Sequence, residues 1–577
     1  MNEGSNGRNY DRAKEEADKV EEQIIAALKS GRSFRVEAGA GSGKTYSLNR
    51  VIGWVQANKW IEYSRKKQNV ICITYTNAAV EVIKERLSND SFILPSTIHS
   101  FAWNAIKQYQ GFLINEVTMN PELMIGEGDF SKVTEVRYTQ GHRYLENGIH
   151  HLYHDDVLKL FCKLLDNAKF RRVFADKYPL ILIDEYQDSY GPIVERFVQY
   201  FIAEGKGPQF GFFGDAWQTI YQSNKACGAI EHDNLEVIKK GANFRSAPRI
   251  VQLLNAIRPD LPQQSALDEF EGEVIVITCE DYKGERRSER NFKDDLPAEE
   301  LKLRLDNVSE KIKRITSAEE SFKVLMITHK VLAAQQGYEE LFDVLKDGLR
   351  DKEDPFLMFF VDVVEPIYYA LDTSDMQLLF DVLGKQYPIT KKSEKNKWKR
   401  LKDDLKESRD KRAVDVLKVI YENKLIPIPP KVDGWYHLYL NAPETKYSSE
   451  VSISSFLDLD YDQFVAAKEF LEPEAQFSTE HGVKGEEYDN VVFVISKGWN
   501  MYQFEKYAPM ITNPSMIPRG KEASFERNRN LFYVCCSRPK KRLFFFVSVP
   551  LDSTFKSFLN DLVGKDNVYT YTQFLEL

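Results

Sequence analysis

The sequence is poor in cysteine and contains no long apolar run. Its 577 residues include six cysteines, and no two of these have the CxxC spacing of structural zinc sites and redox motifs. No apolar stretch approaches the roughly 18 residues that a membrane-spanning helix needs. These absences exclude a disulfide-stapled secreted domain. They predict a reduced, cytoplasmic protein that has no contact with a membrane.

An excess of positive charge is missing as well. The 78 Lys and Arg residues are outnumbered by 87 Asp and Glu residues, so the formal net charge is −9. Proteins that hold nucleic acid by bulk charge have the opposite balance, and any contact with nucleic acid must therefore be local. The hydrophobic content of 43% is that of a folded chain. Its length is enough for about four domains.

Short apolar runs alternate with helical stretches along much of the chain. The alternation begins between residues 33 and 109, returns near residues 178–215, and occurs again in the C-terminal half. Such alternation is typical of parallel sheets with crossover helices. We therefore predict an α/β protein with two separate blocks of this kind. Two inserted segments, at about 111–175 and 351–474, interrupt the rhythm.

A phosphate-binding loop follows the first apolar run. It reads Ala38-Gly39-Ala40-Gly41-Ser42-Gly43-Lys44-Thr45 and leads into a helical stretch, which is the context that a P-loop needs. Backbone amides in such a loop face phosphate oxygens, and the helix N-terminus adds partial positive charge. Lys44 would reach the terminal phosphates of ATP, and the Thr45 hydroxyl would bind Mg²⁺.

The carboxylates that a P-loop enzyme needs come from a second strand. The run Leu180-Ile181-Leu182-Ile183-Asp184-Glu185 ends in two acids. Asp184 would hold Mg²⁺, and Glu185 would orient or deprotonate the attacking water. The sequence therefore predicts ATP and Mg²⁺ as the cofactors.

With these motifs and those that follow them, the chain resembles the superfamily 1A DNA helicases of the UvrD, Rep and PcrA type. The matching strings occur in the family's order. They are Gln23, AGAGSGKT (38–45), ITYTNAAVEVIKERL (73–87), STIHSF (96–101), IDEYQDS (183–189), GDAWQTIY (214–221), NFRS (243–246), STEHGVKGEEYDNV (478–491) and RNLFYVCCSRPKKRL (529–543).

The resemblance implies two RecA-like P-loop domains with inserted, mainly helical subdomains. Domain 1A would comprise residues 1–110 and 176–235, with insertion 1B at 111–175. Domain 2A would comprise residues 236–350 and 475–577, with insertion 2B at 351–474.

The resemblance also implies further roles in the ATP site. Gln23 and Phe244 would bind adenine, Gln218 would sense the γ-phosphate, and Glu487 would contact the ribose. Arg245 and Arg538 would act as arginine fingers, because guanidinium groups suit the charge that develops in phosphoryl transfer. The complete set of predicted catalytic residues is Lys44, Asp184, Glu185, Gln218, Arg245 and Arg538.

Polar and aromatic residues on both blocks would hold single-stranded DNA, because phosphate contacts and base stacking suit binding without sequence preference. For Tyr75, and for Trp217 outside this set, core packing is the alternative interpretation. Ser223 stands where the family has a stacking ring, and Tyr221 would substitute for it. The predicted DNA contacts are Tyr75, Thr76, Asn77, Thr97, His99, Tyr221, Thr479, His481 and Lys484.

The function that the resemblance implies is an ATP-dependent translocase and helicase moving 3′ to 5′ on single-stranded DNA, or on duplex with a single-stranded tail. The shortened first insertion and compact C-terminus resemble helicase subunits encoded beside OLD-family nucleases in Gabija-type phage-defence systems. Because 39 residues follow Arg538, we expect any nuclease to be another chain. The role would be DNA repair or anti-phage defence.

Two other interpretations stay open. The chain could be a regulatory subunit that senses ATP or DNA ends and gates a partner nuclease with little unwinding, which Ser223 favours. A structural protein with a relic ATP site is disfavoured, because all the predicted catalytic residues are present.

Two weaker signals lie in the insertions. His150 and His154 have the spacing of a helical metal pair, but no other cluster completes a coordination sphere, so a polar surface is the better interpretation. Residues 391–412 hold eleven Lys and Arg against five acids. We interpret this stretch as a solvated helix, with contact to duplex phosphates as the alternative.

Overall fold

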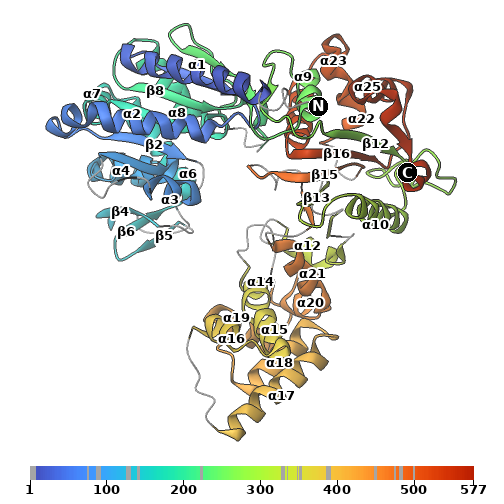
Figure 1. Ribbon diagram of the computed structural model, residues 1–577. Coiled ribbons are helices and arrows are strands. Elements are labelled where there is room, and N and C mark those ends of the chain that lie inside the picture. Colours follow the sequence, from blue (N-terminus) through green and yellow to red (C-terminus); the bar gives the residue numbers. More distant parts are fainter. Residues whose placement is uncertain are drawn as a thin grey trace. The chain divides into compact units, whose positions relative to one another are not determined.

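The structure is a computed structural model, shown in Figure 1. Its contacts divide the chain into two compact units. The first unit consists of Met1–Val274 and Tyr507–Arg542, and the second of Ile275–Lys506 and Leu543–Leu577. The residues that the structure describes are 8–74, 77–85, 87, 92–124, 132–139, 143–220, 225–326, 332–333, 336–346, 349, 354–384, 391–447, 451–472, 476–479, 485–497 and 501–577.

The first unit is built on a six-stranded sheet with the order β3-β2-β7-β8-β1-β9. Every neighbouring pair in this sheet is parallel. The predicted α/β class with parallel sheets is therefore confirmed. The strands are β1 (Phe34–Ala38), β2 (Val70–Thr74), β3 (Ile93–Thr97), β7 (Leu180–Asp184), β8 (Gln209–Gly214) and β9 (Glu236–Lys240).

Both faces of this sheet are covered, which explains why its strands read as continuous apolar runs. In β7, Leu180 and Leu182 pack into the core that also holds side chains of α1 and α2. Ile181 and Ile183 point to the opposite face, into the core that includes α4 and α6. The helices of this unit are α1 (Arg8–Ser30), α2 (Lys44–Arg65), α3 (Asn77–Lys84), α4 (Ile98–Ile106), α5 (Gln110–Met119), α6 (His154–Leu165), α7 (Ala168–Lys177), α8 (Gly191–Phe197), α9 (Pro248–Ile257), α23 (Pro509–Thr512) and α24 (Glu522–Cys536).

Shorter elements complete the first unit. The strands β10 (Ala242–Asn243) and β11 (Gln264–Ser265) pair in parallel. The short helical turns are η1 (Pro121–Leu123), η3 (Tyr186–Asp188), η4 (Val198–Ile202), η5 (Ala216–Gln218) and η7 (Pro514–Met516).

The first insertion contains a small sheet that the sequence pattern did not predict. Strands β4 (Glu135–Tyr138), β5 (Tyr144–Glu146) and β6 (Ile149–Leu152) form it in the order β4-β6-β5. His150 lies on β6 with a fully buried side chain, whereas His154 begins α6. The interpretation of these histidines as a polar surface is therefore wrong for His150. Among the described residues no cluster suited to a metal ion occurs.

The second unit contains another sheet, with the order β14-β13-β15-β16-β12-β17. The pairs β13–β14, β13–β15 and β12–β17 are parallel. Its strands are β12 (Glu273–Thr278), β13 (Phe322–Met326), β14 (Phe477–Thr479), β15 (Tyr488–Ile495), β16 (Pro539–Val547) and β17 (Val568–Thr570). The helices outside the second insertion are α10 (Ala298–Ile315), α12 (Glu339–Leu345), α22 (Phe504–Tyr507), α25 (Ser553–Val563), η8 (Lys565–Asn567) and α26 (Tyr571–Glu576).

The second insertion is a helical lobe with its own core (Figure 1). The basic stretch predicted as a helix forms α17, and its side chains Trp398, Leu401 and Leu405 are buried at helical spacing. In the part of the chain that the structure describes, no helix is both long and apolar enough to cross a membrane. The elements of the lobe are α14 (Pro355–Phe359), η6 (Phe360–Val364), α15 (Glu365–Thr373), α16 (Met376–Leu383), α17 (Lys392–Ser408), α18 (Ala413–Asn423), α19 (Pro430–Asn441), α20 (Ile453–Leu457) and α21 (Asp462–Leu471).

An ion pair ties α17 to α15 inside this lobe. Arg409, directly after α17, donates two hydrogen bonds of 2.9 and 2.7 Å to the carboxylate of Glu365. The Glu365 side chain is 6% exposed, so the carboxylate depends on this guanidinium for compensation of its charge.

We expect Arg409→Met to lower the free energy of local unfolding of α15 and α17 by about 3 kcal/mol, because it leaves a buried carboxylate without its cation. Hydrogen–deuterium exchange of the amides in both helices measures this quantity. Lys411→Met is the matched control: Lys411 pairs with Glu407 at 2.9 Å on the surface, and its loss should change exchange by less than about 0.5 kcal/mol. Equal effects of the two variants would contradict this account.

Candidate active site

The loop between β1 and α2 has the shape that phosphate binding requires. β1 ends at Ala38 and α2 begins at Lys44. Gly41 has a φ of +71°, and a Cβ there would lie 2.7 Å from both the Arg245 Cβ and the Asn243 Oδ1. The hydroxyl of Ser42 is buried without a hydrogen-bond partner among the described residues. Such a buried polar atom in a glycine-rich loop fits an anionic ligand.

Two acids at the end of β7 lie near Lys44, the first residue of α2. Asp184 is the last residue of β7, and Glu185 follows in the left-handed backbone region with a φ of +49°. The Lys44 ammonium is 3.0 Å from the Glu185 carboxylate. Burial and the neighbouring Glu185 raise the pKa of Asp184 to about 7. Burial alone would lower the pKa of Lys44, but Glu185 and Asp215 outweigh it and raise that pKa.

The donor types at this strand end fit Mg²⁺. Asp184 offers a carboxylate and Thr45 an exposed hydroxyl at the start of α2. Oxygen ligands of this kind are the ones that Mg²⁺ prefers. A divalent cation would also compensate the charge of Asp184, which its burial otherwise opposes.

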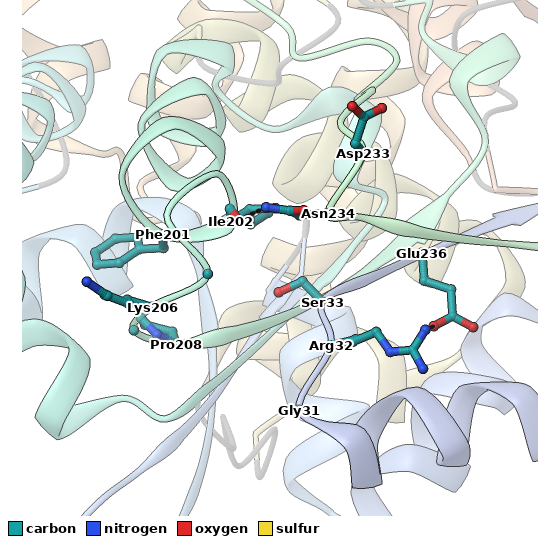
Figure 2. A pocket seen from close by; sticks show the side chains of 12 residues that line it. Gly31, Arg32, Ser33, Phe201, Ile202, Lys206, Pro208, Asp233, Asn234 and Glu236 are labelled. Atoms are coloured by element: carbon teal, nitrogen blue, oxygen red, sulfur yellow. Dashed lines mark hydrogen bonds and ion pairs between the residues drawn. The ribbon is translucent and has the colours of Figure 1, made fainter.

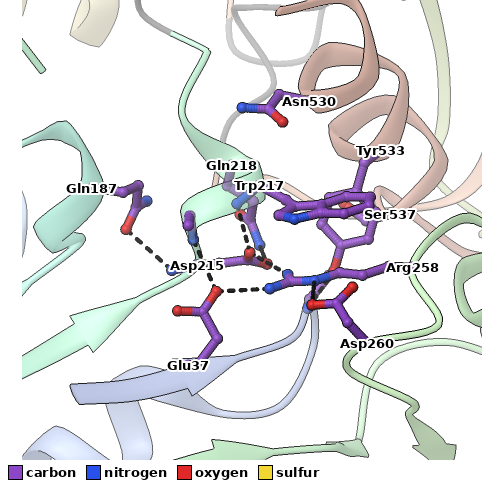
Figure 3. A network of polar contacts seen from close by, with 12 residues as sticks. Glu37, Gln187, Asp215, Trp217, Gln218, Arg258, Asp260, Asn530, Tyr533 and Ser537 are labelled. Atoms are coloured by element: carbon purple, nitrogen blue, oxygen red, sulfur yellow. Dashed lines mark hydrogen bonds and ion pairs between the residues drawn. The ribbon is translucent and has the colours of Figure 1, made fainter. Parts of the chain in front are cut away.

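The predicted γ-phosphate sensor lies at the end of a neighbouring strand. Gln218 ends the short turn η5 after β8, and its side chain is 5% exposed. Its amide nitrogen donates a 2.8 Å hydrogen bond to the carboxylate of Asp215 (Figure 3). Asp215 in turn donates its backbone N–H to the side-chain oxygen of Gln187 at 3.1 Å.

Asn243, the last residue of β10, and Phe244 after it form hydrogen bonds with the backbone of the P-loop. The Asn243 amide donates to the Ala40 carbonyl at 2.9 Å, and the Phe244 N–H donates to the Gly41 carbonyl, also at 2.9 Å. The Phe244 ring is 38% exposed and meets the ring of Tyr10 edge-on at 6.3 Å. The structure thus places Phe244 directly beside the P-loop, with part of its ring open.

The two arginines predicted as fingers lie next to each other in the first unit. Arg245 donates to the Ser537 carbonyl at 3.3 Å. Arg538 is 1% exposed, and its guanidinium donates to the Val534 carbonyl at 3.0 Å. Burial, together with the nearby Arg245, lowers the pKa of Arg538 to about 10. Helix α24, which carries Val534 and ends two residues before Arg538, also contacts the P-loop, because the Ala40 N–H donates to the Tyr533 hydroxyl at 3.3 Å.

Gln23 and Glu487, the predicted contacts to adenine and ribose, are both exposed. Gln23 is exposed on α1, while Glu21, two residues earlier, is buried and bonds to Ser47 of α2 and, at 3.1 Å, to Lys240. Glu487 is exposed and belongs to the second unit. Their predicted contacts to adenine and ribose stay predictions.

The predicted DNA contacts are described only in part. Thr97 caps α4 by accepting a hydrogen bond from the Ser100 N–H at 3.4 Å. His99 meets the ring of His154 at 4.7 Å, and burial together with that histidine lowers its pKa to about 4. Asn77 begins α3, and Thr479 ends β14. Outside the described residues lie Tyr75, Thr76, Tyr221, His481, Lys484 and also Ser223.

A buried polar network beside this site was missed by the sequence reasoning. Arg258 pairs with both Glu37 and Asp215 (Figure 3). The sequence signal is Glu37, a charged residue in a short strand that also carries Arg35, since a charge in a buried strand needs a partner. Trp217, for which core packing was the alternative, packs against Tyr533 with a ring distance of 5.8 Å and lies under the Arg529 guanidinium.

A separate cavity of about 520 Å³ lies at the opposite edge of the sheet (Figure 2). It is lined by the segments 31–33, 205–208 and 233–234, which precede β1, β8 and β9. Because these strands are parallel, the cavity is at their amino ends and the P-loop is at their carboxyl ends. Arg32 and Glu236, which both line it, form an ion pair of 3.3 Å.

Comparisons with known proteins agree with this geometry. Residues 21–224 match a family described as an AAA domain. The chain is 23% identical to the Gabija protein GajB of Bacillus cereus (strain HuB5-5), over 92% of this chain and 95% of that protein. It is also 27% identical to the ATP-dependent DNA helicase Rep of Buchnera aphidicola, over 38% of this chain and 40% of Rep. For PcrA of Bacillus subtilis the identity is 25%, over 38% of this chain and 36% of PcrA.

The chain is a UvrD-like helicase ATPase. Its likeness to GajB spans nearly the whole of both chains, whereas its likeness to Rep and PcrA covers less than half of each. The expected resemblance is thus confirmed, and this helicase uses a nucleotide.

Gly41 gives the most direct test of the loop geometry. We expect Gly41→Ala to lower kcat/KM for ATP by about 10²-fold, because the added methyl must displace Arg245 and Asn243 and shift the loop. Steady-state ATP hydrolysis measures this.

Gly31→Ala is the matched control. Gly31 also has a positive φ, of +73°, but nothing lies within 4 Å of a Cβ placed there. Its substitution should cost about 1 kcal/mol of stability and leave kcat/KM unchanged. A similar loss of activity in both variants would show that backbone strain, rather than crowding against Arg245, is responsible.

Proposed function

We propose that this chain is an ATP- and Mg²⁺-dependent translocase and helicase that moves 3′ to 5′ on single-stranded DNA and acts with a nuclease partner. The observation that carries the proposal is the gathering of the P-loop, Glu185, Gln218, Arg245 and Arg538 in one compact unit. Rep and PcrA, which are named ATP-dependent DNA helicases, support the DNA substrate.

The lysine and glutamate would exchange partners when ATP binds. Lys44 now neutralises Glu185 at 3.0 Å. The terminal phosphates of ATP would draw Lys44 away, since a phosphate carries more negative charge than a carboxylate. Glu185 would then accept a hydrogen bond from the attacking water, while Gln187 keeps it oriented through the hydrogen bond between its amide and that carboxylate.

Charge that develops on the γ-phosphate would be met by Gln218, Arg245 and Arg538. Burial and the neighbouring Arg245 lower the pKa of Arg538, so an anion there would be bound favourably. Mg²⁺, held by Asp184 and Thr45, would neutralise phosphate oxygens. Phe244 would stack on adenine with its exposed face.

Movement on DNA would come from the RecA-like domains of the predicted division, 1A (1–110 and 176–235) and 2A (236–350 and 475–577). Thr97 and His99, at the start of α4, would contact the DNA backbone as neutral hydrogen-bonding groups, since the low pKa of His99 keeps the ring uncharged. A sequence-independent grip of this kind suits a motor.

The likeness to the Gabija protein GajB supports a role in phage defence with a partner protein. We propose that this partner is a nuclease of the OLD family on a separate chain. A second function is favoured by Ser223 in place of a stacking ring. In this second function the chain senses ATP or DNA ends and controls the activity of the nuclease, with little unwinding.

Steady-state ATP hydrolysis with and without single-stranded DNA tests the proposal, with Glu185→Gln as the blank. We expect hydrolysis to be stimulated by DNA and to fall by at least about 10²-fold in the variant, because it loses the group that activates water. Strand displacement should then need a 3′ rather than a 5′ tail.

Two results would contradict the proposal that the chain is a DNA-driven motor. Hydrolysis indifferent to DNA would remove the coupling that translocation needs. DNA-stimulated hydrolysis without strand displacement from either tail would favour the gating function.

A further inference from the structure

Arg258 is a buried charge directly after α9, and no proposed step of hydrolysis uses it. Its side chain is 3% exposed. One guanidinium nitrogen donates to the Glu37 carboxylate at 2.7 Å, and another donates to Asp215. The rings of Trp217 and Tyr533 cover the guanidinium at 5.1 and 5.6 Å (Figure 3). A planar fork between two carboxylates and two rings is an arrangement that only arginine can make.

The two carboxylates hold the turn that carries Gln218. Asp215 accepts hydrogen bonds from the Trp217 N–H at 3.0 Å and from the Gln218 amide at 2.8 Å. Glu37 accepts a hydrogen bond from the Ala216 N–H at 3.1 Å. Both acids are buried, with exposed side-chain fractions of 0% for Asp215 and 8% for Glu37. Arg258 therefore binds both of the groups that fix η5.

The same network reaches the proposed water-activating residue. The backbone N–H of Asp215 donates to the Gln187 side-chain oxygen at 3.1 Å. The amide nitrogen of Gln187 donates to the Glu185 carboxylate. Gln187 is fully buried, so both of its contacts are made away from solvent. A continuous chain of hydrogen bonds thus runs from Arg258 through Asp215 and Gln187 to Glu185.

Charge explains why the guanidinium is needed. Without it, the buried carboxylates of Glu37 and Asp215 would lie together with less compensating charge. Their repulsion would move Asp215, and Gln218 would lose the acceptor that orients its amide. Removal of Arg258 would therefore act on hydrolysis through Gln218 and Glu185 rather than by contact with ATP.

We propose that Arg258 is a positioning residue of the ATPase reaction, which sets Gln218 and, through Gln187, Glu185 against the γ-phosphate. The inference rests on the proposed roles of Gln218 and Glu185. Arg258 lies outside the matched motifs. It follows α9, whereas the motif Asn243 to Ser246 precedes α9 and the motif at residues 529–543 begins within α24.

The test is a mutant cycle of Arg258→Met with Gln218→Ala in the full chain, at saturating single-stranded DNA. We expect each single variant to lower kcat by about 10- to 10²-fold with KM for ATP changed less than about threefold. The double variant should lose clearly less than the product of the two single losses, because part of the effect of Arg258 passes through Gln218. Arg258→Lys should be intermediate, because an ammonium group cannot bind both carboxylates as a fork.

Arg249→Met is the matched control. Arg249 lies on α9 and bonds to the exposed side chain of Gln252, and its replacement should leave kcat unchanged. Thermal unfolding reports whether each variant folds. If Arg258→Met does not fold, the cycle of Arg258→Lys with Gln218→Ala decides in its place.

Multiplicative losses in the double variant would overturn the inference, as would a raised KM with unchanged kcat. If Gln218→Ala is slow but the Arg258 variants match the wild type, this inference fails and the proposed function stands. If the wild type shows no DNA-stimulated hydrolysis, the proposed function fails, and the role of Arg258 fails with it.

Discussion

Parallel strands end at the same edge of a sheet, and the candidate site depends on this constraint. Three strands, β1, β7 and β8, are neighbours in the order β7-β8-β1. The P-loop follows β1, Asp184 and Glu185 stand at the end of β7, and Asp215 and Gln218 follow β8. Residues about 30 to 175 positions apart are thus brought together by one sheet. The covered faces of the sheet leave this edge as the place for polar groups.

Balance of charge is the second constraint at this edge. Glu37, Asp184, Glu185 and Asp215 are four acids in a largely buried region, and Lys44 and Arg258 lie among them. Arg245 and Arg538, by contrast, bind backbone carbonyls. The acids are thus compensated by one lysine and two arginines, because Arg35 also lies 3.5 Å from the Glu37 carboxylate.

Local patterns predicted the parts of this arrangement that depend on sequence neighbours. The apolar run before Asp184 predicted a buried parallel strand, and the glycines from Gly39 to Gly43 predicted the loop between strand and helix. The three-stranded sheet of the first insertion was not predicted, because its strands are three or four residues long. Such strands give too little alternation to be recognised.

Long-range pairing explains the other omissions. Arg258 and Glu37 are 221 positions apart, and no local pattern shows that a charge after one helix compensates an acid in a distant strand. For Gln23, a spacing along the sequence did not determine which side chain of the helix is buried. Its spacing from the P-loop matches the family, but α1 presents Glu21 to α2 through Ser47 and leaves Gln23 exposed. Its role in reading adenine is still a prediction.

The central claim is that these residues form one ATP-hydrolysing site whose γ-phosphate sensor is held by the buried network. A crystal structure of the full chain with ADP, aluminium fluoride, Mg²⁺ and single-stranded DNA tests it most directly. The account predicts that the fluoride lies within hydrogen-bonding distance of Gln218, Arg245 and Arg538, while Arg258 still binds both Glu37 and Asp215. A fluoride site without Gln218, or an Arg258 released from the two carboxylates, would contradict it.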